Sequence, residues 1–432
     1  MKYFKILSLT LVFSVLLSIF SFAANIDVDA KASLLIDAES GQVLYSKNET
    51  AKLYPASITK LMTALIIAEE NDLSQTVTVT ETALENLSAA GSTVGLKKGE
   101  KITVDNLLVC LLVASANEAA NILAEYNAGT VDAFIEKMNK RAETLGLKNT
   151  NFVNAHGLHD DNHYTCAADV ITIARQAMKN ARLAEIVAMQ KATIPATNLE
   201  DERLFFSTNS MLSPYKERTY LYKYTTGIKT GHTTPAGLCL VASATKGDLS
   251  LISVVLGAQY GENKEKGHFI ETTKLFKWGF DSFDRKTILA KTTPISEINV
   301  RLAWSRDHVI AAPDADFTCL VPKDYNKEKL ELIKNVPETL DAPIVKGDVL
   351  GSVSLIYDGV KLGEVDLVAI DDVDRSLILY LWDLLAKLLG TTVAKIVLIL
   401  LGAFILFYLF FIVRFNRRHR NSRRYRGSRR RR

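Results

Sequence analysis

The 432-residue sequence predicts an α+β domain, followed by a small all-β domain and a C-terminal transmembrane helix. In residues 25–284, runs with helical apolar spacing flank two adjacent β runs, Leu238–Ala244 and Leu249–Leu256, which favours helices packed on an antiparallel sheet. In residues 285–372, short strand-length runs alternate with turn residues, which is typical of a small all-β domain. Ile396–Val413 is a run of eighteen uncharged residues that spans roughly 27 Å as a helix, close to the thickness of a bilayer core.

The first 24 residues have the composition of a secretory signal peptide. Lys2 and Lys5 supply a positive start, Ile6–Phe20 is apolar, and Ser21–Ala24 offers small residues for cleavage. An uncleaved N-terminal anchor is the alternative, and both outcomes export the body of the chain. We therefore expect the folded domains to work outside the cytoplasm.

The net charge of +4 is unevenly distributed along the chain. Residues 1–24 contain two lysines and no acid, and residues 414–432 contain eleven arginines and no acid, which leaves −9 on the stretch between them. Because the basic tail directly follows the membrane-length run, the positive-inside rule places residues 414–432 in the cytoplasm. A nucleic-acid partner is therefore not expected.

The four cysteines are scattered over a chain that is large enough to fold without disulfide bonds. We predict that all of them are free packing residues. They are Cys110, Cys166, Cys239 and Cys319.

Before the β runs, the sequence predicts a hairpin over Ala32–Tyr45 and a helix that begins at Ser57. Gln190–Tyr224 carries weak signals and is expected to run over the surface. Further helices are expected at Val104–Val113, Ala119–Tyr126, Val131–Leu145, Asp169–Met178 and Glu262–Phe280.

Residues 376–394 form a predicted amphipathic helix ahead of the transmembrane run. Its leucines share one helical face, while Asp383 and Lys387 pair on the other. Such a helix either lies on a membrane surface or packs against the β domain, and the sequence leaves both alternatives open. The leucines are Leu377, Leu381, Leu384, Leu385 and Leu388.

Ser57 and Lys60 lie three residues apart at the start of a helical pattern, so their side chains share one face and can meet. Pro55 suits a position just before a helix, where its missing N–H is not needed. A helix N-terminus also favours negative charge beside the serine. The spacing therefore allows an amine to activate a hydroxyl, although a serine at this position more often serves only as a helix cap.

Two further short motifs follow in order, Ser115-Ala-Asn117 and Lys229-Thr-Gly231. Each is a weak signal by itself. Together with Ser57 and Lys60 they supply a nucleophile, an amine base, a second hydroxyl, an amide that can hold a peptide and a cation for a carboxylate. This set is complete for acyl transfer, and the combination occurs in β-lactamases and penicillin-binding proteins.

The chain resembles the low-molecular-mass penicillin-binding proteins that are serine-type D-alanyl-D-alanine carboxypeptidases. The resemblance covers roughly residues 25–370 and implies a penicillin-binding/β-lactamase-like transpeptidase domain of α+β (α/β-type) class. Besides the three motifs, the similar stretches are Leu34–Gly41, Pro55–Ala64, Asn151–Leu158, Gly227–Thr233 and Ala236–Ala244.

The resemblance implies catalytic roles for Ser57, Lys60 and Ser115. Ser57 would attack the carbonyl between two D-alanines, a neutral Lys60 would take its proton, and Ser115 would pass a proton to the leaving amine. Asn117 would bind the peptide backbone and orient Lys60.

The other implied substrate-binding residues lie together after the second motif. Lys229 and Thr230 would hold the terminal carboxylate, and Gly231 completes the Lys-Thr-Gly motif. The backbone N–H groups of Ser57 and His232 would form an oxyanion hole.

Three positions depart from the pattern of these relatives. Ala116 replaces the usual glycine and Glu118 the usual aspartate, and neither is expected to change the chemistry. Some relatives place an arginine before the Lys-Thr-Gly strand, where this chain reads Ser207-Thr208-Asn209. Arg218 is a candidate replacement for that arginine.

His156, His159 and His163 lie in a polar loop with Asp160 and Asp161, which raises the alternative of a zinc enzyme. No His-Glu-x-x-His motif accompanies them, and the serine machinery is complete without a metal. We predict no metal and no cofactor.

The leading hypothesis is a membrane-anchored carboxypeptidase that trims peptidoglycan pentapeptide stems and is inhibited covalently by β-lactams. A β-lactamase is the second possibility; the β domain and the anchor disfavour it, and no convincing deacylation glutamate precedes the Lys-Thr-Gly strand. A protein that only binds wall peptides is the third, which the complete set of motifs disfavours.

Overall fold

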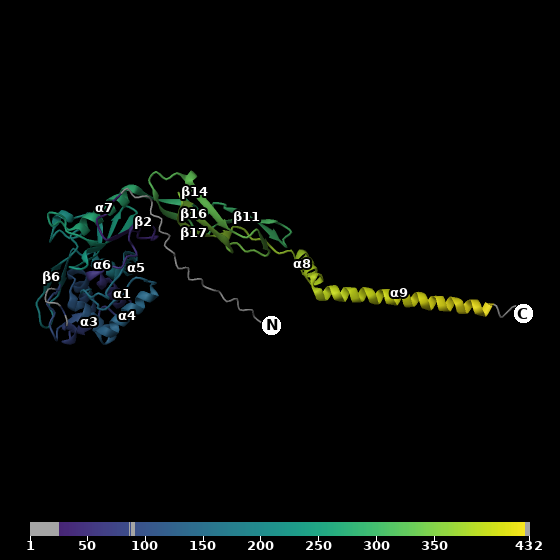
Figure 1. The fold of residues 1–432 in the computed structure, drawn as a ribbon, viewed down its shortest axis with the longest axis horizontal. Coiled ribbons are helices and arrows are strands. Elements are labelled where there is room, and N and C mark those ends of the chain that lie inside the picture. Colours follow the sequence, from purple (N-terminus) through teal and green to yellow (C-terminus); the bar gives the residue numbers. More distant parts are fainter. Residues whose placement is uncertain (1–25, 86, 88–90, 428–432) are drawn as a thin grey trace. The chain divides into compact units, whose positions relative to one another are not determined.

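The structure is a computed structural model that describes residues 26–85, 87 and 91–427 (Figure 1). The predicted signal peptide, residues 1–24, and the end of the basic tail, residues 428–432, lie outside the described residues. The chain forms two compact units. Within the described residues, the first comprises residues 26–288, Thr318–Glu331 and Ile356–Leu362, and the second Leu289–Phe317, Leu332–Leu355 and residues 363–427.

A five-stranded antiparallel sheet with the order β2-β1-β9-β8-β7 forms the centre of the first unit. The predicted hairpin and the two predicted β runs are confirmed as β1–β2 and β8–β9. In this sheet β7 is the outermost strand next to β8. The strands are β1 (Ala32–Asp37), β2 (Val43–Lys47), β7 (Thr225–Thr233), β8 (Gly237–Lys246) and β9 (Leu249–Ala258).

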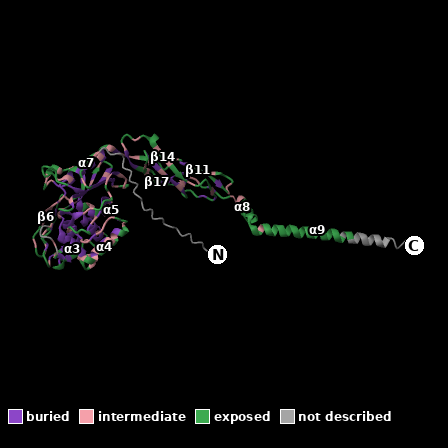
Figure 2. Ribbon diagram, viewed as in Figure 1, coloured by how far each residue is buried: buried purple, intermediate pink, exposed green. Residues whose placement is uncertain are grey.

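Helices cover both faces of this sheet, and each face contributes to its own core (Figure 2). Along β1, Leu34 and Ile36 enter the larger core with helices α1 to α6, whereas Leu35 enters the smaller core with α7, as the alternation of a strand requires. This arrangement is the predicted α+β (α/β-type) class. The helices are α1 (Lys60–Glu70), α2 (Val104–Val109), α3 (Asn117–Ala128), α4 (Val131–Thr144), α5 (Ala167–Met178), α6 (Ala181–Val187) and α7 (Gly267–Ser282).

The predicted helices are confirmed with shifted ends. The run from Val104 is α2 followed by a π-helical turn at Cys110–Ala114, and α7 begins at Gly267 instead of Glu262. Ser57 lies in a 3₁₀ turn, Ala56–Thr59, and the α-helix itself begins at Lys60. All four cysteines are buried and free, as predicted.

The prediction that Gln190–Tyr224 runs over the surface is right for most of the segment and wrong for residues 207–213. Its first part forms a hairpin of β5 (Lys191–Ile194) and β6 (Arg203–Phe206), and most of residues 207–213 are buried.

The buried part of this segment keeps its polar side chains hydrogen-bonded. Asn209 Nδ2 donates to the carbonyl oxygen of Gly227 (3.1 Å), and Ser213 Oγ donates to that of Gln190 (2.9 Å). Because buried polar groups find partners inside the protein, the low hydrophobicity of the segment concealed its burial.

Smaller elements complete the first unit and its connections. Two further two-stranded sheets pair β3 (Thr76–Thr78) with β4 (Lys101–Thr103) and β10 (Phe283–Leu289) with β13 (Phe317–Pro322). Short 3₁₀ turns lie at Thr82–Leu84, Arg218–Tyr220 and Lys327–Lys329.

A six-stranded sheet with the order β14-β16-β17-β12-β11-β15 forms the predicted all-β part. Within it β11 pairs antiparallel with β12 and parallel with β15. The strands are β11 (Ser296–Arg301), β12 (His308–Pro313), β14 (Leu330–Asn335), β15 (Thr339–Asp341), β16 (Val349–Tyr357) and β17 (Val360–Ala369).

The amphipathic helix is present as α8 (Leu377–Gly390), and the Oγ of Ser376 caps its N-terminus. None of its residues is buried, and its five predicted face leucines are 44% to 70% exposed. The alternative of a helix whose leucines pack on the β domain therefore finds no support, because this face has no protein cover.

The last helix, α9 (Thr392–Gly427), contains the predicted transmembrane run. Thr392–Phe415 has a mean hydropathy of 3.1 and none of it is buried, so its length and composition are compatible with a membrane anchor.

Candidate active site

Ser57 and Lys60 are held in contact by a tight turn at the start of α1. Pro55 precedes the 3₁₀ turn that contains Ser57, and Lys60 is the first residue of the α-helix. Lys60 Nζ lies 3.0 Å from Ser57 Oγ. The predicted pair therefore meets, with the hydroxyl on the pocket wall and the amine fully buried.

Lys60 has two further fixed hydrogen-bond partners. Its Nζ donates to Asn117 Oδ1 (2.7 Å) and to the carbonyl oxygen of His156 (2.6 Å). Burial holds the pKa of Lys60 well below its usual value, and the charge of Lys229 lowers it further, whereas Glu118 opposes the shift. A neutral amine has two hydrogens and one lone pair, so these two acceptors leave the lone pair for Ser57 Oγ.

Ser115 and Asn117 are positioned by a break between two helical segments. The π-helical turn ends at Ser115, whose φ of +66° is left-handed, and α3 begins at Asn117. The change of direction lets both side chains reach the pocket.

Lys229 reaches Ser115 from the opposite side, on β7. Its Nζ donates to Ser115 Oγ (2.9 Å) and to the carbonyl oxygen of Thr230 (2.9 Å). The side chain is 1% exposed, and burial, with help from the charge of Lys216, lowers its pKa to about 7. Lys229 can therefore gain or lose a proton near neutral pH.

Gly231 lets strand β7 approach the nucleophile closely. A Cβ at this position would lie 3.0 Å from the carbonyl oxygen of Pro55 and 3.1 Å from the backbone nitrogen of Ser57. His232 follows on the same strand and lines the pocket.

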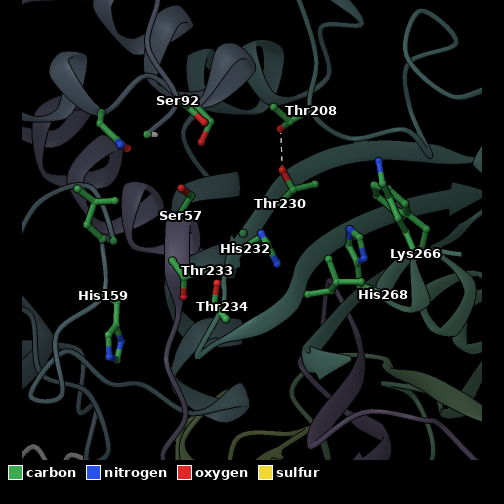
Figure 3. Close-up of a pocket in the computed structure, with 18 of the residues that line it drawn as sticks. Ser57, Ser92, His159, Thr208, Thr230, His232, Thr233, Thr234, Lys266 and His268 are labelled. Atoms are coloured by element: carbon green, nitrogen blue, oxygen red, sulfur yellow. Dashed lines mark hydrogen bonds between the residues drawn. The ribbon is translucent and has the colours of Figure 1, made fainter. Parts of the chain in front are cut away.

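These residues surround a pocket of about 680 Å³, shown in Figure 3. Its wall includes six of the eight predicted site residues, and Lys60 and Lys229 lie behind it, hydrogen-bonded to wall residues. The structure thus brings all eight predicted residues together. The six on the wall are Ser57, Ser115, Asn117, Thr230, Gly231 and His232.

Sequence reasoning missed Thr208, which also lines the pocket. Thr230 Oγ1 donates to Thr208 Oγ1 (2.7 Å), the contact drawn as a dashed line in Figure 3. Its only sequence signal was its place in Ser207-Thr208-Asn209, where some relatives have an arginine. Arg218 is exposed and is not among the described residues that line the pocket, whereas Lys266 is.

Glu118 holds a loop beside the pocket and does not line it. Its Oε1 accepts from Thr93 Oγ1 (2.6 Å) and from the backbone nitrogens of Val94 (2.6 Å) and Gly95 (3.1 Å). The carboxylate therefore fixes the course of this loop.

The three histidines of the polar loop have different surroundings. His156 and His163 are buried, and burial lowers their pKa values to about 3 and about 4. His159 is exposed and lies 3.5 Å from Asp161. Within the described residues, no three His, Cys, Asp or Glu side chains form a candidate metal cluster.

Fold and pocket define the class of low-molecular-mass penicillin-binding proteins. The chain is similar to the crystal structure of penicillin-binding protein 5 from Haemophilus influenzae, with a TM-score of 0.67 and 30% identity over 82% of this chain and 100% of that one. It is also similar to penicillin-binding protein 6B from Escherichia coli, with a TM-score of 0.62 and 26% identity over 80% and 96% of the two chains.

The chain belongs to the D-alanyl-D-alanine carboxypeptidase family, whose model matches residues 20–260. A second model, the C-terminal domain of penicillin-binding protein 5, matches residues 283–375. Among curated relatives, D-alanyl-D-alanine carboxypeptidase DacF of Bacillus subtilis is 31% identical over 81% of this chain and 87% of its own length. DacA of Haemophilus influenzae is 32% identical over 82% and 88%. The resemblance expected from the motifs is therefore confirmed.

Proposed function

We propose that the protein is a serine D-alanyl-D-alanine carboxypeptidase that removes the terminal D-alanine from peptidoglycan pentapeptide stems through an acyl-enzyme on Ser57. The observation that carries the serine mechanism is the environment of Lys60. Its amine lies 3.0 Å from Ser57 Oγ, is fully buried, and has its two remaining hydrogens bound by fixed acceptors. These features favour the neutral, proton-accepting form.

Acylation begins when Lys60 Nζ takes the proton of Ser57 Oγ. The oxygen attacks the carbonyl carbon of the penultimate D-alanine, and the backbone N–H groups of Ser57 and His232 would stabilise the oxyanion. Loss of one such donor costs about 100- to 1,000-fold in other enzymes, so the close approach allowed by Gly231 matters for the rate.

The C–N bond then breaks, and the leaving nitrogen takes a proton from the Ser115 hydroxyl. Lys229, 2.9 Å from Ser115 Oγ and with a pKa of about 7, can replace that proton. Water later attacks the acyl-enzyme ester from the side of Ser115. The proton of the water passes through Ser115 to Lys229, and Lys60 returns its proton to the Ser57 oxygen. The balance of protons closes after each turnover.

The free carboxylate of the substrate is bound beside Lys229 and Thr230, which shortly precede His232 on β7. The positive charge of Lys229 and the hydroxyl of Thr230 support this position, and Thr208 extends the hydroxyl pair. Asn117 lines the pocket, with its amide available to the peptide backbone.

We further propose that residues 1–24 are a signal peptide, that residues 25–284 and 285–372 are the catalytic and all-β domains, and that residues 396–413 span the cell membrane. Residues 376–394 then lie on the membrane surface, and residues 414–432 remain in the cytoplasm. The exposed leucines of α8 and the hydropathy of α9 support this topology.

The test combines two measurements on the purified extracytoplasmic part. Fluorescent penicillin should label the wild type covalently and leave Ser57→Ala unlabelled, and a defined pentapeptide should release D-alanine. A labelled Ser57→Ala enzyme would contradict the role of Ser57. Rapid nitrocefin turnover would favour a β-lactamase, and binding without D-alanine release would favour a non-catalytic protein.

A further inference from the structure

His163 is a buried side chain that the mechanism above does not use. It is 2% exposed, and both of its ring nitrogens are hydrogen-bonded. Nδ1 accepts from the backbone nitrogen of Val153 (3.1 Å), and Nε2 lies 2.7 Å from Thr59 Oγ1. The histidine therefore joins its own loop to the turn that carries Ser57.

The partners of this ring assign its tautomer. Because Nδ1 accepts from an N–H, the proton of the neutral ring sits on Nε2 and is donated to Thr59 Oγ1. Thr59 Oγ1 then donates its own hydrogen to the carbonyl oxygen of Ala56 (2.8 Å). Burial keeps the ring neutral by lowering its pKa to about 4. The bonds thus run in one direction from Val153 to Ala56.

This series of hydrogen bonds ends at the peptide group that joins Ala56 to Ser57. Ala56 has a φ of +47°, a left-handed conformation that costs energy for a residue with a Cβ. The carbonyl oxygen of Ala56 also packs closely against Gly157: a Cβ added to Gly157 would lie only 1.9 Å from this oxygen. The nitrogen of the same peptide group carries the Ser57 N–H that the proposed mechanism uses in the oxyanion hole.

We propose that His163, acting through the Thr59 hydroxyl, is a positioning residue that fixes the Ala56–Ser57 peptide group for acylation. The inference rests on the proposed role of Ser57. Thr59 and His163 do not line the pocket, so they act on the rate through the orientation of Ser57 and its N–H, without touching substrate.

The primary test compares Thr59→Val with Thr59→Ser in the extracytoplasmic enzyme. Valine keeps the shape and removes the hydroxyl, whereas serine keeps the hydroxyl. Because small misplacement of reacting groups costs up to about 100-fold, we expect Thr59→Val to lower the rate constant of penicillin labelling about 10- to 100-fold. Thr59→Ser should stay close to wild type. For pentapeptide hydrolysis kcat should fall with KM unchanged, since the pocket wall is intact.

A second pair tests the histidine itself. The side-chain amide of a glutamine at position 163 can reach Thr59 Oγ1, as the histidine Nε2 does. The shorter amide of an asparagine reaches only as far as the position of Nδ1. His163→Gln should therefore label faster than His163→Asn when both are folded at the assay temperature. A purely structural role predicts rates that follow melting temperature alone in both pairs, and that result would overturn the proposal.

The two proposals fail in different ways. If Ser57→Ala is unlabelled but Thr59→Val labels at the wild-type rate, only the positioning role is wrong. If Ser57→Ala is labelled, the proposed function itself is wrong.

Discussion

Two buried lysines flank the pocket, one on helix α1 and one on strand β7, and their surroundings differ. Lys60 is bound by a hydroxyl, an amide oxygen and a backbone carbonyl, and its pKa lies well below the usual value. Lys229 is bound by the Ser115 hydroxyl and the Thr230 carbonyl, and its pKa is lowered only to about 7.

The difference shows how one residue type can serve two tasks in one site. Burial acts on both lysines, and the second influence on Lys60 is the charge of Lys229 itself. A cation on the strand therefore helps to keep the helix lysine neutral. The neutral one can accept the proton of Ser57, and the other can carry charge for a carboxylate near neutral pH.

The largest expected effect comes from making Lys60 permanently charged, compared with the same change at Lys229. Arginine does not lose its proton, so Lys60→Arg should slow penicillin labelling by about 100- to 10,000-fold, the usual value of general base catalysis. Lys229→Arg keeps a cation for the carboxylate and leaves Lys60 free to accept the proton of Ser57, but it cannot replace the proton of Ser115. Its labelling should therefore slow less than that of Lys60→Arg. Equal rates in the two variants, measured on enzyme whose folding is checked by circular dichroism, would remove the proposed division of labour.

The distance between strand β7 and the turn that carries Ser57 depends on Gly231, and Gly231→Ala should increase it. The added Cβ would lie 3.0 to 3.1 Å from the Pro55 oxygen and the Ser57 nitrogen, so strand or turn must shift. We expect labelling to slow by up to about 100-fold with a small change in melting temperature. Gly390→Ala, where no atom lies within 4 Å of the new Cβ, is the matched control. A Gly231→Ala enzyme as fast as that control would show that this approach does not limit acylation.

The helix side was easier to predict from sequence than its supports. The contact between Ser57 and Lys60 follows from helical spacing. Their catalytic interpretation depends on the second and third motifs, which supply Asn117 and Lys229. The third partner of Lys60 is the backbone carbonyl of His156, and a backbone atom leaves no trace in residue type.

Two side chains, Thr208 beside strand β7 and His163 beside the turn that carries Ser57, were missed for other reasons. Thr208 lies in a polar segment whose burial is satisfied by internal hydrogen bonds, so its composition is that of a surface loop. His163 looked like an ordinary loop histidine because its contact with Thr59 joins residues 104 positions apart. Contacts at such separation depend on the tertiary fold and not on local pattern.

A smaller effect concerns stability and pH on the strand side. The folded pKa of Lys229 is about 7, below its unfolded value, so the unfolded chain binds more protons between about pH 7 and the ordinary lysine value of about 10.5. The free energy of unfolding should therefore rise with pH in this window relative to Lys229→Met, by at most about 1.4 kcal/mol per pH unit. Denaturant titrations at several pH values measure the difference, and a flat or falling difference would contradict the depressed pKa.

The smallest expected effect concerns the pKa of Lys60 on helix α1. Glu118 shifts this pKa in the opposite direction to Lys229. The Glu118 carboxylate raises the pKa of Lys60 against the two lowering influences, while its Oε1 holds the loop at Thr93. Glu118→Gln keeps an accepting oxygen but removes the charge, so the pKa of Lys60 should fall further. The acid limb of the labelling-rate profile should then move slightly to lower pH, whereas the exposed control Glu136→Gln should leave it in place. A move to higher pH would mean that Glu118 acts on Lys60 through the loop it holds and not through its charge.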